Sequence, residues 1–331
     1  MRAFVLDAYG RPLNEADVPE PIVGDRDVLV QVAAAGLNRL DAKIQQGALK
    51  LVVPYTPPVV LGHDVAGRVV EVGSAVRSFA PGDRVLARPR DPRIGTFAER
   101  IAVDEADVAP TPPAITDVEA ASLPLVALTA WQALVERGRV RPGQRVLIHA
   151  GSGGVGTIAI QLAKHRGAHV ATTASSAHAA FVRELGADVV IDYRTQDFVR
   201  ELAGYDVVLD SLGGENLERS LRVLRPGGAA IGIQGPPDPA FAREAGLNPL
   251  LRVGVSGLSR RIRGRARRLG VSYEFLFMRA DGAQLREIAA LVESGAIRPV
   301  VGAVHPFADT AAALAGLGTT SIRGKTVITV P

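Results

Sequence analysis

The stretch RVLIHAGSGGVGTIAIQLAKHRGAHV, residues 145–170, decides the fold of this chain. Its first residues, RVLIHA, predict a strand, and VGTIAIQLAKHRG predicts the helix that follows. Between them, Gly151, Gly153 and Gly156 form the pattern G-x-G-x-x-G. A glycine-rich turn between a strand and a helix presents backbone N–H groups to the pyrophosphate of a dinucleotide. The alternative is a glycine-rich turn that binds nothing, and the strand–turn–helix context favours the dinucleotide site.

Each glycine of this loop has its own expected role. We expect Gly151 to permit the tight turn, Gly153 to let the backbone approach the pyrophosphate, and Gly156 to let the helix pack on the strand. The residues expected to contact the cofactor here are Gly151, Ser152, Gly153, Gly154, Val155 and Gly156.

The next predicted strand indicates which dinucleotide is bound. It ends in TTASSAH, residues 172–178, and contains no acidic residue of the kind that binds the ribose hydroxyls of NAD. The candidates for the 2′-phosphate of NADP(H) are Ser175 and Ser176, whose hydroxyl and N–H groups donate hydrogen bonds, and Thr173 is a further expected cofactor contact. His178 adds charge when it is protonated, whereas Arg183 and Arg194 are better interpreted as solvated. We therefore predict NADP(H) as the cofactor.

Alternating strands and helices from residue 145 onward predict a doubly wound, parallel α/β sheet of the Rossmann type, whose last strand is VSYEFLF, residues 271–277. Residues 1 to about 110 instead hold short β-like runs between Gly and Pro turns, which is typical of a barrel. Thr116 or Asp117 is expected to cap a helix, and a second helix is expected over residues 128–137. Because β character returns near the end, we predict a discontinuous domain, 1–120 with 280–331, around a nucleotide-binding domain, 121–279.

Composition excludes several classes of site. The 331 residues are 47% hydrophobic and 22% charged, which is typical of a soluble globular protein. There is no cysteine, so disulfides, thiolate nucleophiles and cysteine-bearing zinc sites are excluded, and none of the six histidines forms an H-E-x-x-H pair. No signal peptide and no run of about 18 apolar residues is evident, so we expect a cytoplasmic protein with no membrane partner.

Charge is nearly balanced over the chain but not along it. The net charge of +4 does not favour nucleic acid as a partner. The stretch RRIRGRARR, residues 260–268, nevertheless holds six arginines. It is interpreted as a solvated surface, with a basic rim for an anionic cofactor or substrate as the alternative and a nucleic-acid site as the least favoured one.

Several further motifs occur in one order along the chain: AAAGLNRLDAKIQQG, LGHDVAGRVVEVGSAV, FAPGDRV, GTFAE, ASLPLVALTAW, AGSGGVG, ELGADVVIDY, SGAIRPVV and RGKTVITV. With them the chain resembles the medium-chain dehydrogenase/reductase superfamily over essentially its whole length, and most of all the zinc-free branch of quinone oxidoreductases and alkenal/enone reductases. The resemblance implies a GroES-like β-barrel catalytic domain beside a Rossmann domain, an active site in the cleft between them, and a homodimer.

The resemblance also assigns residues to the cofactor. It places Tyr193 near the adenosine end or against the 2′-phosphate, and Thr129 near the phosphates or ribose. It places Leu212, Gly213 and Gln234 along the nicotinamide half, and Lys325 on a strand that reaches the cofactor. One departure is the segment 236–270, which is longer and more basic than its counterpart in short members, so no role is transferred to it.

Zinc-containing members take a cysteine where this chain has Asn38 and a histidine where it has His63. Without the cysteines we predict no metal. The resemblance implies hydride transfer from NADPH to a quinone or an α,β-unsaturated carbonyl, and hydrogen-bond donors can stabilise the enolate that develops.

Each candidate catalytic residue also has a structural interpretation. Asn38 is a donor to the carbonyl or a loop-structuring amide, Asp41 an orienting group or a helix cap, Lys43 a proton source or a solvated lysine, Tyr55 a donor or a packing residue, and His63 a pocket wall or a packed histidine.

Two other functions remain open at this point. One is an NADPH-binding sensor or crystallin-like protein with little catalysis, for which the same glycine loop is sufficient. The other is a zinc-type alcohol dehydrogenase, which the missing cysteines disfavour.

Overall fold

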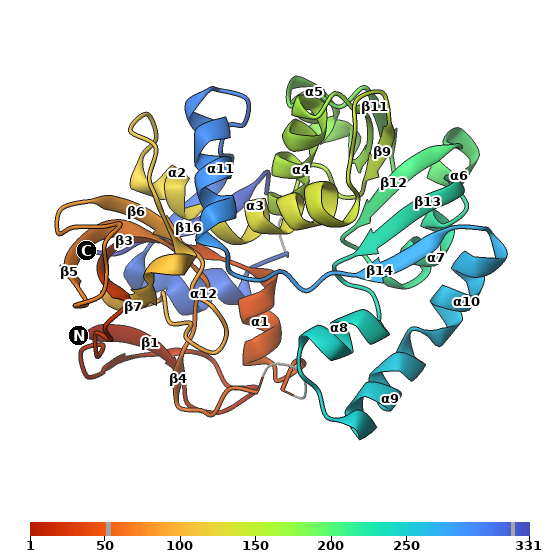
Figure 1. The fold of residues 1–331 in the computed structure, drawn as a ribbon. Helices are drawn as coiled ribbons and strands as arrows, with labels where there is room; N and C mark the ends of the chain where they lie inside the picture. The colour runs from red at the N-terminus through yellow and green to blue at the C-terminus, as the bar shows by residue number, and fades with distance from the viewer. Residues whose placement is uncertain (51–53, 319–321) are drawn as a thin grey trace. The chain divides into compact units, whose positions relative to one another are not determined.

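The computed structural model describes residues 1–50, 54–318 and 322–331 (Figure 1). By its internal contacts the chain divides into two compact units: unit 1 comprises residues 1–128 and 279–331, and unit 2 comprises residues 129–278. The first boundary falls within helix α3 (Pro124–Trp131). In the described ranges, no helix is both long and apolar enough to cross a membrane.

Unit 1 is built on a seven-stranded sheet. Its strands follow the order β15–β16–β3–β5–β6–β8, and β7 pairs with β3 outside this path. The two strands from the C-terminal part join the N-terminal strands because β16 pairs antiparallel with β3, with Thr326 opposite Leu37. The strands are β3 (Asp27–Leu37), β5 (Asp64–Val72), β6 (Arg84–Ala87), β7 (Arg100–Asp104), β8 (Val108–Pro110), β15 (Val301–Pro306) and β16 (Lys325–Thr329).

A second, three-stranded sheet in unit 1 has the order β2–β1–β4, made of β1 (Arg2–Leu6), β2 (Asn14–Asp17) and β4 (Val59–Val60). The core of the unit is a cluster of apolar side chains that includes Val30, Val65, Val85, Phe97 and Ile328. The helices of the unit are α1 (Arg39–Gln45), α2 (Asp117–Ala121), α11 (Gly282–Glu293) and α12 (Thr310–Ala315), with short 3-10 helices at Glu105–Asp107 and Phe307–Asp309.

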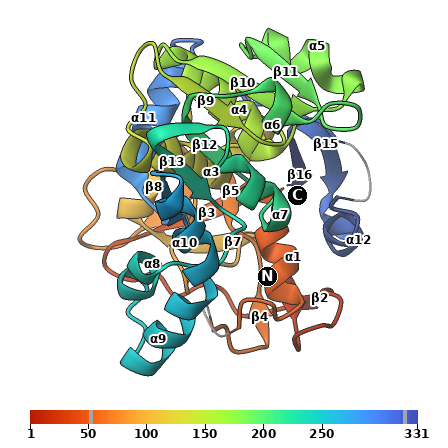
Figure 2. The same ribbon diagram turned by 90° about the vertical axis from the view of Figure 1, so that its right-hand side faces the viewer.

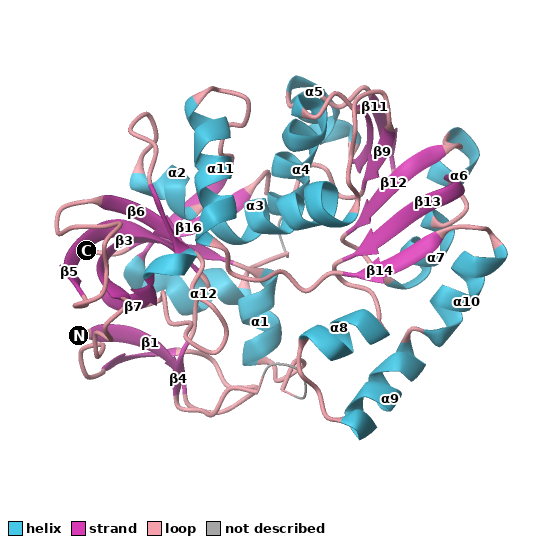
Figure 3. Ribbon diagram, in the orientation of Figure 1, coloured by secondary structure: helices cyan, strands magenta, loops and turns pink. Residues whose placement is uncertain are grey.

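Unit 2 contains a six-stranded, fully parallel sheet with the order β11–β10–β9–β12–β13–β14 (Figure 3). Counted from its first strand this order is 3-2-1-4-5-6, the doubly wound arrangement that binds dinucleotides where the strand order reverses. The expected fold class is confirmed. The strands are β9 (Arg145–Ile148), β10 (His169–Ala174), β11 (Val189–Asp192), β12 (Tyr205–Asp210), β13 (Leu224–Gly232) and β14 (Ser272–Phe275).

The helices of unit 2 connect these strands and extend beyond them (Figure 2). Those that connect the strands are α4 (Gly154–His165), α5 (Ser176–Glu184), α6 (Phe198–Glu201) and α7 (Gly214–Ser220). Between β13 and β14 the chain forms α8 (Pro239–Glu244), α9 (Pro249–Leu258) and α10 (Arg260–Arg268). This long insertion is the segment that the sequence marks as a departure from short members of the family.

Of the two helices expected between the domains, the first has the expected cap and the second begins earlier than expected. Thr116 caps α2 as expected, since its side chain accepts the N–H of Glu119. The second helix, expected over residues 128–137, begins earlier, at Pro124, because proline with its fixed φ is well suited to the first turn of a helix. Its second half, Gln132–Arg137, is π-helical rather than α-helical, which the apolar pattern alone does not predict.

Candidate active site and cofactor site

Helix α1 begins at a cap made by two of the predicted site residues. Asn38 precedes the helix with extended backbone, and Asp41 is its third residue. Asp41 Oδ2 accepts the backbone N–H of Asn38 at 2.8 Å, and both groups are buried. A carboxylate in the first turn also lies at the positive end of the helix dipole. Asp41 therefore caps α1, as its structural interpretation expects, and its second oxygen is available for another partner.

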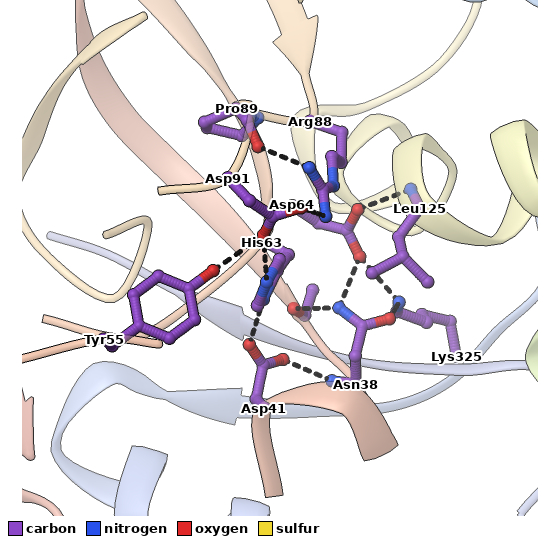
Figure 4. Close-up of polar contacts among 11 residues, drawn as sticks. Asn38, Asp41, Tyr55, His63, Asp64, Arg88, Pro89, Asp91, Leu125 and Lys325 are labelled. Atoms are coloured by element: carbon purple, nitrogen blue, oxygen red, sulfur yellow. Dashed lines mark hydrogen bonds and ion pairs between the residues drawn. The ribbon is translucent and has the colours of Figure 1, made fainter. Parts of the chain in front are cut away.

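The side chain of Asn38 belongs to a buried ionic cluster (Figure 4). Its Nδ2 donates to Asp64 Oδ2 at 2.9 Å and to the carbonyl of Gly36 at 3.3 Å. Its Oδ1 accepts a hydrogen bond from the ammonium of Lys325, which also donates to Asp64 Oδ2 at 2.6 Å. The backbone N–H of Leu125 donates to the other oxygen of Asp64 at 2.6 Å. Because the whole amide is engaged inside the protein, a donor role toward substrate requires one of these bonds to break.

A second cluster surrounds His63, whose side chain is fully buried between two carboxylates (Figure 4). The distance from His63 Nδ1 to Asp41 Oδ1 is 2.5 Å, and that from Nε2 to Asp91 Oδ1 is 3.6 Å. The second distance is too long for a direct hydrogen bond, so Nε2 has no hydrogen-bond partner among the described residues. Asp91 accepts the phenol of Tyr55 at 2.6 Å and the guanidinium of Arg88 at 2.8 Å.

The charges of this second cluster set its protonation states. Burial by itself lowers the pKa of His63, but the carboxylate of Asp41 outweighs it and the net pKa is raised. Burial raises the pKa of Asp91, yet His63 and Arg88 hold the pKa of that carboxyl well below its usual range. Burial, aided by the charge of Asp91, raises the pKa of Tyr55 above its ordinary value. Below the raised pKa of His63 the cluster is an imidazolium between two carboxylates, next to a neutral phenol.

Lys43 differs from the other four candidate catalytic residues. It lies on α1 and is half-buried, whereas Asn38, Asp41, Tyr55 and His63 are buried. Burial, and to a smaller extent the charge of Arg39, lowers the pKa of its ammonium. A lowered pKa brings an ammonium closer to the range in which it gives up its proton at neutral pH. The role of Lys43 as a proton source stays a prediction.

In unit 2, the glycine loop lies between the end of β9 and the start of α4. The residue with left-handed backbone is Ala150, with φ of 53°, and not Gly151, so the role expected for Gly151 is corrected. A Cβ at Gly151 would lie 2.1 Å from Thr172 Oγ1, and one at Gly156 would lie 2.3 Å from the carbonyl oxygen of Ala150. Both positions require glycine, because the loop lies against strand β10 at Gly151 and helix α4 lies against the loop at Gly156.

Gly153 is different, because the protein does not crowd it. Among the described residues, a Cβ at Gly153 would have one neighbour within 4 Å, the carbonyl oxygen of Ala150 at 3.4 Å. Gly153 caps α4 with extended backbone, and the first N–H groups of a helix have no partner inside it. Open space beside unpaired donors at a helix N-terminus fits an anionic ligand such as a pyrophosphate.

An acidic residue that was not expected from the sequence lies beside the end of β10. Ser175 caps α5 and is buried, and Ser176 is exposed. The N–H of Ser176 donates to Asp192 Oδ2 at 3.1 Å, and Asp192 Oδ1 accepts the N–H of Arg194 at 3.0 Å. Ala174 and Asp192 are partners in the register of β10 and β11, so an acid from the third strand reaches the place where none was expected from the second. The N–H of Ser176 is thus already engaged.

The other predicted cofactor residues differ in burial and in hydrogen-bond partners. Thr173 Oγ1 accepts the N–H of Ala150 at 3.0 Å and so supports the glycine loop. Gly213 has φ of 70° and donates its N–H to Asp210. Tyr193 and Leu212 are exposed on unit 2. Lys325 lies in unit 1 and pairs with Asp64, so a contact with the cofactor stays a prediction, as do the roles of Thr129, Ser152, Gly154, Val155 and Gln234.

Comparison with known proteins identifies the family. Residues 24–113 match the model of the alcohol dehydrogenase GroES-like domain, and residues 185–328 match that of the zinc-binding dehydrogenases. The NAD(P)H oxidoreductase RTN4IP1, mitochondrial, of Danio rerio is 35% identical, with 100% of this chain and 91% of that protein covered. The chain belongs to the medium-chain dehydrogenase/reductase superfamily.

Other relatives place it in the quinone oxidoreductase and enone reductase branch of that superfamily. The NADPH-dependent alkenal/one oxidoreductase, chloroplastic, of Arabidopsis thaliana is 34% identical over 99% of this chain and 79% of its own length. The structure of the quinone oxidoreductase from Coxiella burnetii superposes with a TM-score of 0.86, at 30% identity and with 100% and 99% of the two chains covered. This medium-chain dehydrogenase/reductase is therefore an oxidoreductase.

The zinc site of some members of the superfamily does not fit these residues. Asn38 and His63 stand at the ligand positions, but the ammonium of Lys325 bonds to Asn38 and both ring nitrogens of His63 face carboxylates. Because the ammonium of Lys325 already occupies the Asn38 position, His63 by itself does not provide a ligand set for a metal cation. Within the described part of the chain, no group of three or more His, Cys, Asp or Glu side chains can hold a metal ion.

Three residues of unit 1 that organise the site were not expected from the sequence. Asp64 is not among the candidate residues from the sequence, although its carboxylate is the centre of the first cluster. Arg88 and Asp91 had no assigned role, although they complete the cluster around His63. The stretch ARPRDPR, residues 87–93, gave a signal, since charged residues directly after a buried strand need partners.

Proposed function

We propose that this protein is an NADPH-dependent reductase that transfers hydride to a quinone or to an α,β-unsaturated carbonyl without a metal. The observation that carries the proposal is the ammonium of Lys325, which bonds to both Asn38 and Asp64 where zinc-containing members bind their metal. Relatives support the acceptor class, since they include the NADPH-dependent alkenal/one oxidoreductase and the 2-methylene-furan-3-one reductase of Solanum lycopersicum.

A conjugated acceptor suits a site of this kind. The cofactor, when bound, supplies the hydride. In an enone or quinone the negative charge that develops spreads onto the carbonyl oxygen, and hydrogen-bond donors stabilise it without a Lewis acid. A saturated ketone gains more from a metal, because its charge develops fully on one oxygen. The proposal therefore favours conjugated acceptors over simple ketones.

The residues of the chain divide this work between them. The glycine loop, with the space beside Gly153, holds the pyrophosphate at the N-terminus of α4. On the substrate side, Lys43 supplies the proton, which its lowered pKa favours, or steadies the enolate oxygen as an ammonium. Asp41 and His63 are positioning residues, because the cap and the pair that they form hold the start of α1 in place.

We further propose a homodimer in the cytoplasm. The relative from Danio rerio carries the word mitochondrial in its name, which describes the location of that protein. Sedimentation of the purified protein tests the dimer, and fractionation of the cells that produce it tests the compartment.

The test of the function is NADPH oxidation with a panel of acceptors. We expect turnover of tailless quinones, alkenals and enones, and much slower turnover of saturated ketones. Lys43→Met is expected to lower kcat/KM about tenfold or more and to remove the loss of activity that accompanies deprotonation of Lys43 at high pH. Lys50→Met, at an exposed lysine, is the matched control and should behave as the wild type. Tight NADPH binding without turnover of any acceptor overturns the proposal and favours a sensor.

A further inference from the structure

Helix α9 presents its apolar residues to the solvent. None of its ten residues is buried, and the exposed fractions of Leu250, Val253 and Leu258 are 86%, 74% and 63%. Residues at these spacings lie on one face of a helix. A surface helix of a globular protein normally turns such a face toward the core, so α9 is inverted with respect to the ordinary pattern.

The apolar face of α9 is also open. A Cβ at Gly254 or Gly257, the two glycines between these side chains, would meet no described atom within 4 Å. The polar residues lie on the other side of the helix, where Arg252 donates to the carbonyl of Leu247 and Ser256 to that of Arg252. Two glycines and ten residues make a weak helix in water. Contact of this face with an apolar environment would stabilise α9.

Helix α10 follows at once, with only Ser259 between the two helices (Figures 1 and 2). It is anchored by Ile262 and Ala266, which are buried in the apolar cluster of unit 2. Its outer side carries the exposed arginines Arg260, Arg261, Arg267 and Arg268.

The positive charge of this segment is only partly balanced by the protein. Arg261 and Arg265 share one acid, Glu218, at 3.0 Å and 2.8 Å. From residue 239 to residue 270 the sequence has eight arginines and one acidic residue, Glu244. The whole chain has a net charge of +4, so the rest of the protein is net negative and the excess positive charge is concentrated here.

We propose that α9 and α10 together bind the surface of an anionic phospholipid bilayer. The apolar face of α9 enters the boundary between headgroups and acyl chains, and the arginines of α10 bind lipid phosphates. A nucleic acid would use the arginines but would leave Leu250, Val253 and Leu258 in water. A bilayer satisfies both sets of residues, and the proposal departs from the expectation that no membrane is involved.

Membrane binding also narrows the substrate class, and this step rests on the proposed function. Quinones with long apolar tails dissolve in the bilayer and not in water. A reductase held at the membrane surface reaches such an acceptor, whereas a protein that stays in bulk solution does not. The site assigned above then acts on lipid-dissolved quinones.

The binding test uses the full chain and vesicles of defined composition. Vesicles of phosphatidylcholine with phosphatidylglycerol should sediment with the protein, and vesicles of phosphatidylcholine alone should sediment with far less of it. Raised salt should weaken the binding, because it screens the arginines. No sedimentation with anionic vesicles overturns the proposal.

Two double variants separate the contributions. Leu250→Glu with Val253→Glu removes the apolar contact, and Arg267→Gln with Arg268→Gln removes two charges; each should weaken vesicle binding about tenfold or more. Arg200→Gln with Arg222→Gln, at exposed arginines elsewhere on unit 2, is the charge-matched control and should bind as the wild type. Binding that survives Leu250→Glu with Val253→Glu, or that DNA and anionic vesicles compete for equally, overturns the bilayer assignment.

An activity measurement distinguishes the two proposals. With a tailless quinone in solution, the Leu250→Glu, Val253→Glu variant should keep wild-type kcat/KM, which also shows that it is folded. With a long-tailed quinone in anionic vesicles, its rate should fall about tenfold or more. Equal loss with both quinones overturns the membrane inference. Vesicle binding without turnover of any acceptor overturns the proposed function and leaves the membrane surface standing.

Discussion

The ammonium of Lys325 and the carboxylate of Asp64 form an ion pair of 2.6 Å between residues that lie 261 positions apart in the sequence. Both side chains are buried, and Asn38 bonds to each of them. The first residue of the returning strand β16 is thus tied to the first residue of β5 and to the cap of α1. The pair joins the C-terminal part of unit 1 to the helix that carries Lys43.

Breaking this pair should destabilise the protein strongly. Lys325→Met leaves the charge of Asp64 buried without its partner, and such a change typically costs about 3–5 kcal/mol. Asp64→Asn with Lys325→Met removes both charges, so the double variant should lose less free energy of unfolding than the sum of the single variants. Urea unfolding of Lys325→Met, Asp64→Asn and the double variant measures this. Strictly additive losses would show that the two groups are not coupled.

The pair of His63 and Asp41 should make stability depend on pH. The folded pKa of His63 is raised above the ordinary value of 6.5, so its contribution is complete below pH 6.5 and is lost as pH rises through the folded pKa. His63→Gln cannot become charged, so the difference in free energy of unfolding between wild type and variant should shrink as pH rises above 6.5. Unfolding in urea over a series of pH values checks this, and a constant difference would contradict it.

Gly153 and Gly156 should respond differently to the same substitution. Gly153→Ala adds a methyl group where the protein leaves space, so stability should change little while the Kd for NADPH rises about tenfold, because the group meets the pyrophosphate. Gly156→Ala places a Cβ 2.3 Å from the carbonyl oxygen of Ala150 and should cost about 1–3 kcal/mol of stability. Thermal unfolding and NADPH titration separate the effects. Unchanged NADPH affinity in Gly153→Ala would place the cofactor elsewhere.

Asp192 should weaken the preference for NADPH. Its carboxylate bonds to the N–H of Ser176 beside the residues predicted to bind the 2′-phosphate, and its pKa is lowered by the backbone N–H of Arg194, so it is charged at neutral pH. Asp192→Asn should lower the KM for NADPH by about two- to fivefold at low salt and leave the KM for NADH nearly unchanged. Steady-state kinetics with both cofactors measures this, and equal changes for the two would show that Asp192 supports the loop without sensing the phosphate.

Local sequence patterns were sufficient to predict the elements that depend on residues adjacent in the sequence. The glycine spacing after an apolar strand predicts the loop at the start of α4, and Thr116, one of the two residues expected to cap a helix there, caps α2. The failures arose where a neighbour in space decides the role. Gly151 is required by Thr172 on the adjacent strand, and the acid beside Ser176 comes from the end of β11.

The sequence by itself determined the class of this protein: a glycine loop for a dinucleotide, strands that return to the first domain, and no cysteine for a zinc site. The tertiary structure decided what the polar residues of unit 1 do. His63 looks in the sequence like half of a metal site, and in the fold it lies between Asp41 and Asp91. The reason is physical: a buried charge needs a partner, and which partner it meets depends on how distant strands pair, as β16 pairs with β3 and brings Lys325 to Asp64.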